Sequence, residues 1–224
     1  MNLKILNELE RVIKTSPQTL RDSLKLRQLI QATFDVTVMD TTGTLSELTD
    51  KIDEAVLAKY FGEIWQPQTK KFKYSGLNVV KEINDLKPRS VVDLGCGYNE
   101  FKKQIPNLVG VDPYNKNADI QLPILEYKPE QKFDVVIVLG SINFGSTDKI
   151  FAELEHAVSL CAEGGTMFFR VNPGVKHEPP ESDWIDFYHW DANFITNCAS
   201  HFNLQMLDMR NDSNDRMYFV WRRS

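Results

Sequence analysis

The chain has 224 residues, of which 42% are hydrophobic and 25% charged, as is ordinary for a soluble globular protein of one large domain or one domain with an appendage. Its net charge of -5 and pI near 5.4 exclude general electrostatic binding to nucleic acid or to an anionic membrane. Nucleic acid could then be bound only through a local basic patch. The three cysteines are widely spaced, so they indicate neither a disulfide framework nor a zinc site, and we expect no metal.

The N-terminus shows no sign of a targeting segment. Residues 1–4 do not lead into a long apolar run, as a signal peptide would. No stretch approaches the roughly 20 apolar residues that a membrane-spanning helix needs. Because unpaired cysteines suit a reducing compartment, we expect a cytoplasmic protein with no membrane partner. The sequence leaves the oligomeric state open.

Residues 1–70 are predicted to form a helical appendage. Apolar residues recur at helical spacing through residues 1–33. Thr44 and Glu47 form a capping box that begins a further helix. We expect this appendage to pack on the core of the protein. The alternative is that it caps a substrate pocket or forms a dimer interface.

The remaining domain, residues 71–224, is organised around the stretch Val91–Asn99. A short β-branched apolar run passes into a turn with two glycines, Gly95 and Gly97, and then into a segment that could be helical. Strand, glycine turn and helix, in this order, build the nucleotide site of an open α/β sheet. Asp93 lies near the end of the strand, and the glycines let a ligand approach the backbone closely.

A second apolar strand, Leu108–Val111, leads into Asp112. A carboxylate at this point can accept both hydroxyl hydrogens of a ribose. The structural alternative is a turn aspartate before a proline, here Pro113. Because Asp112 ends the strand that follows the glycine turn, the sequence favours the ribose role.

The rest of the chain supplies the other elements of an α/β sheet. Residues 133–140 form a nearly continuous apolar run, as expected for a central parallel strand covered on both faces. The helix that follows is expected to end at the turn Glu163-Gly164-Gly165. Further expected elements are helices at 75–86, 101–105, 147–161 and 191–201, strands at 119–122 and 166–171, and a C-terminal antiparallel hairpin of 204–209 and 217–221.

These elements, in this order, resemble the class I S-adenosylmethionine-dependent methyltransferases over about residues 75–224. The resemblance rests on the glycine motif at 91–97, the acid in Val111-Asp112, Asp119-Ile120, the strand at 133–140, the glycine turn at 163–165 and the terminal hairpin. It implies a seven-stranded Rossmann-like sheet, mostly parallel, with a C-terminal antiparallel hairpin. It also implies methyl transfer from S-adenosylmethionine, with S-adenosylhomocysteine as product. Asn99 stands where a third glycine is often found, and asparagine tolerates a left-handed conformation.

The resemblance further implies which residues hold the methionine part and the ribose of the donor. Asp93 would lie near the ammonium. The backbone of Gly95, Cys96 and Gly97 would receive the methionine part, and Asp112 would hold the ribose.

For the adenine and the reacting sulfur, the resemblance implies a second group of residues. Pro113 and Ile120 would sandwich the adenine, and Asp119 would accept from its amino group. The residues that would run beside the sulfonium are Leu139, Gly140 and Ser141. Methyl transfer is an in-line displacement on an activated donor, so alignment and exclusion of water can supply much of the catalysis without a dedicated base.

The main alternative for the glycine turn is the pyrophosphate site of a nicotinamide dinucleotide. That site needs Gly-x-Gly-x-x-Gly opening on a helix N-terminus, and Glu100 stands at the sixth position here. Its side chain would block close packing of helix on strand, and its carboxylate would repel a pyrophosphate. S-adenosylmethionine carries an ammonium and a cationic sulfur, so an acidic turn suits it.

The acceptor side is predicted in the loop 172–190, which leaves the last parallel strand at its carboxyl end. His177 and His189 are candidate bases, and Asn143 and Tyr188 could orient an acceptor. For each residue taken alone, a surface or packing role is the stronger interpretation.

The class of acceptor follows from what the sequence lacks. Residues 140–144 do not match the Asp/Asn-Pro-Pro-aromatic motif of DNA amino-group methyltransferases, and no cysteine follows a proline, as cytosine C5 enzymes require. The aromatics Trp184, Tyr188 and Trp190 could stack a flat acceptor or pack the loop on the sheet. With the acidic charge, this favours a small-molecule acceptor. The rival from another class is a catalytically silent methyltransferase fold that serves as a binding or assembly module.

Overall fold

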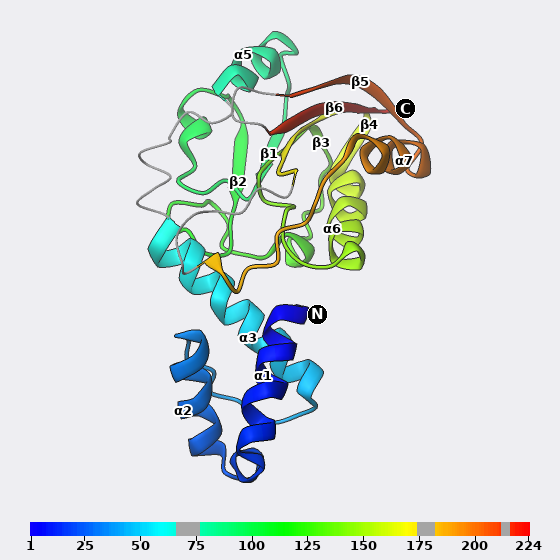
Figure 1. Cartoon of the computed structure of the whole chain (residues 1–224). Helices are drawn as coiled ribbons and strands as arrows, with labels where there is room; N and C mark the ends of the chain where they lie inside the picture. The colour runs from blue at the N-terminus through cyan, green and yellow to red at the C-terminus, as the bar shows by residue number, and fades with distance from the viewer. Residues whose placement is uncertain (66–76, 174–181, 212–215) are drawn as a thin grey trace. The chain divides into compact units, whose positions relative to one another are not determined.

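The computed structural model describes residues 1–65, 77–173, 182–211 and 216–224 (Figure 1). The chain divides into two compact units, Met1–Trp65 with Lys176–Asp186 and Gln66–Val175 with Phe187–Ser224. We expected a boundary near residue 70. The division also assigns the described segment 182–186, which follows the last parallel strand in the chain, to the unit of N-terminal helices.

The described part of the N-terminal unit is helical. Its elements are α1 (Leu3–Thr15), η1 (Pro17–Arg21), α2 (Ser23–Phe34), α3 (Leu45–Lys59) and η2 (Tyr60–Ile64). The capping box predicted for Thr44 and Glu47 is confirmed, because the Thr44 hydroxyl accepts from the Glu47 N–H while the Glu47 carboxylate accepts from the Thr44 N–H at 2.7 Å. The fully buried core side chains include Ile5, Leu9, Ile30 and Ile52.

Both polar atoms of the Asn2 side chain form hydrogen bonds at the start of α1. Its side-chain oxygen accepts from the N–H groups of Lys4 and Ile5, at 3.1 and 3.3 Å. Its side-chain nitrogen donates to the Asp53 carboxylate in α3 and to the Trp184 carbonyl, both at 2.7 Å. Asn2 is only 1% exposed, so these partners replace water for both of its polar atoms.

The segment 182–186 packs on the N-terminal helices at two further points. The Lys4 ammonium donates to the Ile185 carbonyl at 2.9 Å. The ring of Trp184 meets that of Phe34 edge-on, with centroids 4.8 Å apart. Ile185 is fully buried. Part of the loop that the sequence assigned to the acceptor is therefore anchored in the N-terminal unit, and Trp184 has a packing role there.

Replacing Asn2 with alanine is expected to lower the free energy of unfolding of the N-terminal unit by about 2 kcal/mol. A lost helix cap accounts for about 1 kcal/mol, and buried partners left unsatisfied account for about 1 kcal/mol or more. Urea unfolding followed by far-ultraviolet circular dichroism measures the change. The matched control is Asp22→Ala, which removes the exposed cap of α2. Equal losses in the two variants would show that the bonds to Asp53 and Trp184 contribute nothing.

The second unit is built on a sheet whose described strands follow the order β2-β1-β3-β4-β6-β5. The strands are β1 (Val91–Leu94), β2 (Leu108–Val111), β3 (Phe133–Leu139), β4 (Cys161–Val171), β5 (Leu204–Asn211) and β6 (Met217–Arg223). The first four strands of that order are parallel, and β6 pairs antiparallel with β4 and β5. The predicted C-terminal hairpin is therefore confirmed. The strand order reverses between β1 and β3, the point at which open α/β sheets bind ligands.

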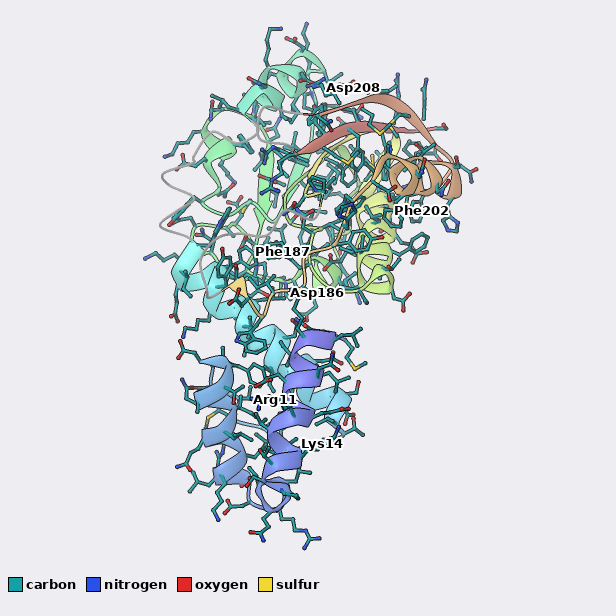
Figure 2. All side chains as sticks on the ribbon, in the orientation of Figure 1. Arg11, Lys14, Asp186, Phe187, Phe202 and Asp208 are labelled. Carbon is teal, nitrogen blue, oxygen red and sulfur yellow. The ribbon has the colours of Figure 1, made fainter. Side chains whose placement is uncertain are left out.

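Each face of this sheet carries its own apolar core. The helical elements of the unit are α5 (Leu77–Asp85), η3 (Glu100–Lys103), η4 (Ile124–Glu126), α6 (Thr147–Leu160) and α7 (Ala192–His201). Helices α6 and α7 lie together beside the sheet (Figure 1) and share a core with Val92 and Leu94, whereas α5 packs with Val91 on the other face. Phe202, labelled in Figure 2 just after α7, packs 5.1 Å from the ring of Phe151 in α6.

The described sheet has six strands, one fewer than expected. Residues 119–122 make only a single parallel bridge, from Ile120 to Val111 at the edge of the sheet. Two features end the pairing there. The Asp119 carboxylate accepts from the Gly110 N–H of β2 at 2.8 Å, and Pro123 offers no N–H for a longer ladder.

The Glu163-Gly164-Gly165 turn does not end the preceding helix, contrary to expectation. Helix α6 already ends at Leu160, and Cys161 pairs with Phe133 of β3. The turn therefore lies inside β4, where the register with β3 shifts. Gly164 has a φ of +72°, so the glycine serves a β-bulge rather than a helix cap.

Candidate functional site

The predicted turn lies where the carboxyl ends of β1, β2 and β3 meet. The N–H groups of Gly95 and Cys96 both donate to the Val111 carbonyl, at 2.7 and 3.1 Å. From the loop after β3, the Ser141 hydroxyl donates to the Leu94 carbonyl. The structure thus brings together the turn, the end of β2 and the loop after β3, which sequence reasoning had assigned to one site.

Gly95 and Gly97 both have left-handed backbone conformations, for different reasons. Gly95 has a φ of +80°, and a Cβ there would lie 2.1 Å from the Cβ of Ser141. Gly97 has a φ of +53°, and a Cβ there would meet no heavy atom within 4 Å. Gly95 is therefore required for packing of the turn, whereas Gly97 borders open space at the end of the sheet.

Asn99 adopts the left-handed conformation expected at this position, with a φ of +56°. Its amide nitrogen donates to the Asn117 carbonyl at 3.1 Å and to the Asp119 carboxylate at 3.2 Å. Its side chain also covers Gly110, where a Cβ would lie 2.4 Å from Asn99 Oδ1. Asn99 therefore joins the turn to β2 and to the chain that follows β2.

Asp112 follows β2, is 8% exposed, and accepts three backbone hydrogen bonds. Its Oδ1 accepts from the N–H groups of Tyr114 and Asn115 at 2.8 and 2.9 Å, and its Oδ2 accepts from that of Gly97 at 3.0 Å. Burial raises the pKa of Asp112, and the three N–H donors offset part of that rise. A carboxylate has about four acceptor positions. The geometry therefore leaves one acceptor position at Oδ2.

Asp119 is held by three donors within the protein. Its Oδ2 accepts from the Gly110 N–H at 2.8 Å and from Asn99 at 3.2 Å, while its Oδ1 accepts from the Lys102 ammonium at 2.6 Å. Burial opposes the charged form, but the hydrogen bonds from Gly110, Lys102 and Asn99 together hold the pKa of Asp119 below its ordinary value. These contacts fasten the turn to β2 and occupy most of the carboxylate's acceptor positions.

The other residues predicted to line the donor site gather at the same edge of the sheet. Ile120 bridges to Val111, and Pro113 lies two residues beyond the end of β2. Leu139 ends β3 and packs against the core on the α5 face. Gly140 follows with a φ of +97°. Ile120, Pro113, Leu139 and Gly140 are all half-buried, so part of each side of the turn is accessible.

Asp93 is a buried carboxyl group in β1, 2% exposed, with Gly110 and Ile137 as its neighbours across the strands. Within the described residues, no donor hydrogen-bonds to it. Burial, and then the negative charge of Asp112, raise the pKa of Asp93 to about 7. Burial and the neighbouring acids also raise the pKa of the Cys96 thiol, so this cysteine is neutral and poorly suited to act as a nucleophile.

Asn143 has a structural role, because it hydrogen-bonds to two other segments of the chain. It is 4% exposed, and its side-chain oxygen accepts from the Asn172 N–H at 2.9 Å. Its carbonyl accepts from the Tyr188 N–H at 2.8 Å. Asn143 therefore joins the loop after β3 to the end of β4 and to the chain that leads into α7.

Of the remaining catalytic candidates, the structure describes Tyr188 and His189. The Tyr188 hydroxyl hydrogen-bonds to Thr147, and burial raises the pKa of Tyr188, so its phenol is no base near neutral pH. His189 is exposed and forms a bridge with Pro173 at the end of β4. His177 lies outside the described residues.

Trp190 packs the loop onto the sheet. It is fully buried, and its indole N–H donates to the Ile142 carbonyl at 3.1 Å. Its ring lies 5.3 Å from that of Phe194 and 6.0 Å from that of Phe219. For Trp190, as for Trp184, packing is therefore the role that the structure supports.

Sequence reasoning missed two residues that build the site. Lys102 pairs with Asp119, and Gly110 makes room for Asn99. A glycine inside an apolar strand is a known sign of close approach by another group, and that signal was present at Gly110. The position of Lys102 in the sequence gave no sign that it would pair with Asp119.

The described ranges contain neither a candidate metal site nor a candidate membrane-spanning helix. No group of three or more histidine, cysteine, aspartate or glutamate side chains there is arranged to hold a metal ion. No helix there is long and apolar enough to cross a membrane.

The fold of the second unit is that of the S-adenosylmethionine-dependent methyltransferases. The chain is similar to 1,6-didemethyltoxoflavin-N1-methyltransferase from Burkholderia thailandensis, solved with 1,6-didemethyltoxoflavin and S-adenosylhomocysteine, with a TM-score of 0.62 and 14% identity over 84% of this chain and 95% of that one. It is also similar to magnesium protoporphyrin IX methyltransferase from Synechocystis PCC 6803, with a TM-score of 0.57 and 12% identity over 83% and 100% of the two chains.

A third similar structure is an S-adenosylmethionine-dependent methyltransferase from Clostridium acetobutylicum ATCC 824, with a TM-score of 0.55 and 12% identity over 75% and 99% of the two chains. A scan against models of protein families finds no match, and a search of curated proteins finds none. At 12–14% identity, these likenesses show the fold.

Proposed function

We propose that the second unit binds S-adenosylmethionine at the turn after β1 and transfers its methyl group to a small-molecule acceptor. The observation that carries this proposal is an open position at Gly97 beside two buried carboxyl groups, Asp93 and Asp112. A backbone-lined, acidic site suits a ligand that carries an ammonium and a cationic sulfur. The fold shared with solved methyltransferases supports the same ligand.

In this proposal, the donor lies across the carboxyl ends of β1 and β2. Asp93 faces the ammonium, and the backbone from Gly95 to Gly97 receives the methionine part. Asp112 accepts one ribose hydroxyl at Oδ2, the oxygen with an acceptor position left.

On the adenine and sulfonium sides, this proposal gives the donor fewer partners than the sequence implied. Pro113 and Ile120 cover the adenine, whereas Asp119 acts by fastening the turn through Lys102 and Gly110. Leu139 and Gly140 border the sulfonium, and the Ser141 hydroxyl serves to hold the end of β1.

The dinucleotide alternative loses support at the segment after the turn. A pyrophosphate site needs the N–H groups at the start of a helix. Here Glu100–Lys103 is a 3₁₀ turn of 4 residues, too short to supply them. The buried acids Asp93 and Asp112 would also repel a pyrophosphate.

When bound, the donor supplies an already activated methyl group. The protein then has to align the acceptor with that group and keep water away, which can provide much of the rate enhancement. Asn143 and Tyr188 fit positioning roles, because their hydrogen bonds hold the loops after β3 and β4 together. His189, which bridges to Pro173 just after β4, and His177 are the proposed proton acceptors where the methyl acceptor carries a proton.

A small-molecule acceptor is favoured by the net charge of -5, which disfavours nucleic acid. The 1,6-didemethyltoxoflavin and magnesium protoporphyrin IX methyltransferases that share the fold are named for small-molecule acceptors. Transfer of labelled methyl from S-adenosylmethionine to fractionated cell extract tests the proposal. Label is expected among small molecules. Label confined to protein or nucleic acid would overturn the proposed acceptor class.

A module that binds the donor without transferring methyl is the second candidate. It is favoured by the position of Tyr188, which is tied into packing, and of His189, which faces solvent. Donor binding without label in any fraction of the extract would support this module and contradict the enzyme.

Replacing Asp112 with asparagine is expected to weaken binding of S-adenosylmethionine and S-adenosylhomocysteine by roughly tenfold, since a lost charge-assisted hydrogen bond is worth about 1.5 kcal/mol. Isothermal titration calorimetry measures the change. The matched control is Asp148→Asn, an exposed aspartate of α6. Equal affinity in Asp112→Asn and wild type would remove the ribose assignment.

A further inference from the structure

Three carboxyl groups surround the turn, but the structure neutralises only one of them with a cation. Asp119 receives the Lys102 ammonium at 2.6 Å. Asp112 receives three backbone N–H groups, which stabilise its charged form. Asp93 receives neither kind of partner from the described residues.

The surroundings of Asp93 make its ionised form costly. It is 2% exposed, and its cross-strand neighbours are Gly110, which has no side chain, and the apolar Ile137. The charge that acts on Asp93 is that of Asp112, which has the same sign. A buried carboxyl without a donor or a cation keeps its proton to higher pH than an exposed one.

The other charged groups on the α5 face of the sheet have partners of their own or lie further from Asp93. In α5, which covers the face, Lys81 pairs with Asp85, and Glu82 pairs with Arg210. In β4, Arg170 lies in register with Leu139 of β3, one strand further from Asp93.

After the turn, the exposed residues are Glu100 and the basic pair Lys102 and Lys103 in η3. Lys102 is bound to Asp119. The Cys96 thiol, next to Asp93, is neutral. No described cation therefore holds Asp93 in its charged form.

We propose that binding of the donor expels a proton from Asp93, so that donor affinity rises with pH across the neutral range. The inference rests on the proposed function, because it takes the ammonium of the donor as the cation that arrives beside Asp93. The bond that breaks is the O–H of the Asp93 carboxyl, and the proton passes to solvent. No other reactant is needed.

The direction of the effect follows from the two states of Asp93. Without ligand, burial and the charge of Asp112 raise the pKa of Asp93 to about 7, so about half of the sites are protonated at pH 7. An adjacent ammonium favours the carboxylate and lowers the pKa of Asp93 in the complex. Below pH 7, binding must therefore displace a proton and is weakened. Above pH 7, the site is already ionised.

Release of the proton should depend on whether the ligand carries the ammonium. S-adenosylhomocysteine carries the ammonium and should expel the proton. 5′-Methylthioadenosine keeps the adenosine and a sulfur but lacks the amino-acid part, so it brings no cation to Asp93. Its binding should be independent of pH between pH 6 and 7.5.

Calorimetric titration of the full chain with S-adenosylhomocysteine, in phosphate and in imidazole buffer, measures the proton directly. The two buffers differ in ionisation enthalpy, so the difference in binding heat counts protons released. We expect about half a proton per site at pH 7. We also expect an affinity roughly tenfold weaker at pH 6 than at pH 7.5, and no such change for 5′-methylthioadenosine.

Two variants assign the proton to its residue. Asp93→Asn should abolish proton release while S-adenosylhomocysteine still binds, though more weakly. Asp148→Asn, on the surface of α6, should release the same proton as wild type. Binding of S-adenosylhomocysteine without proton release, or equal release by 5′-methylthioadenosine, would overturn the inference while leaving the donor site intact. No binding of either sulfur ligand at any pH would overturn the proposed function itself.

Discussion

The Asp93→Asn variant is expected to be more stable than wild type without ligand at pH 7.5, and to bind the donor less well. Because the pKa of Asp93 is raised to about 7 in the folded protein, from 3.8, folding becomes less favourable as pH rises from about 4 to about 7. Each pKa unit is worth about 1.4 kcal/mol. Asparagine has nearly the same shape and carries no proton to lose, so the variant escapes this penalty.

Urea unfolding at pH 4.5 and pH 7.5 measures the effect. Between these two values, the stability of Asp93→Asn relative to wild type should rise by about 3 kcal/mol, a large part of the stability of an ordinary domain. Parallel pH dependence in the two proteins would contradict the account of Asp93. Asp148→Asn, at an exposed position in α6, should follow wild type.

The Gly95→Ala variant is expected to lose both stability and donor binding. A Cβ at this position would lie 2.1 Å from that of Ser141, and the φ of +80° disfavours any residue with a side chain. The left-handed conformation costs about 1 kcal/mol, and forcing an extra carbon into a packed site costs about 1–3 kcal/mol. We expect a total loss of about 2–4 kcal/mol, measured by urea unfolding, and no heat of binding with S-adenosylhomocysteine.

The matched control is Gly97→Ala, two residues along the same turn. Its φ of +53° carries a similar backbone cost, but the added carbon meets no heavy atom within 4 Å. We expect the fold to be kept with a loss of about 1 kcal/mol. The added methyl group should nevertheless intrude on the donor and weaken its binding at least tenfold. Unchanged affinity in this variant would show that the donor does not lie against Gly97.

Much of the fold could be predicted from periodicity and turn chemistry. The run Phe133–Leu139 is buried on both faces, so its apolar character shows directly in the sequence. The C-terminal hairpin and the capping box at Thr44 are local patterns, and both are confirmed. Local patterns were misleading at Gly164, because a glycine with positive φ fits a helix end and a β-bulge equally well.

The candidate site was predictable in its location but not in its detailed bonding. The sequence placed Asp112 and Asp119 at strand ends. It could not show that Asp112 accepts three N–H groups, or that Lys102 and Asn99 engage Asp119. These contacts depend on how the loops after β1 and β2 fold against each other. The anchoring of Trp184 beside Phe34 joins residues far apart in the chain, which no single-sequence pattern reports.

The measurement that tests the donor site most directly is thermal unfolding of the full chain with S-adenosylmethionine, S-adenosylhomocysteine or NAD. At 100 times Kd, a ligand that binds only the folded state adds about 2.7 kcal/mol. That corresponds to a rise in Tm of roughly 5–10 °C for a chain of this size. We predict this rise with both sulfur ligands and none with NAD. No rise with either sulfur ligand, or a rise with NAD alone, would contradict the donor site after β1.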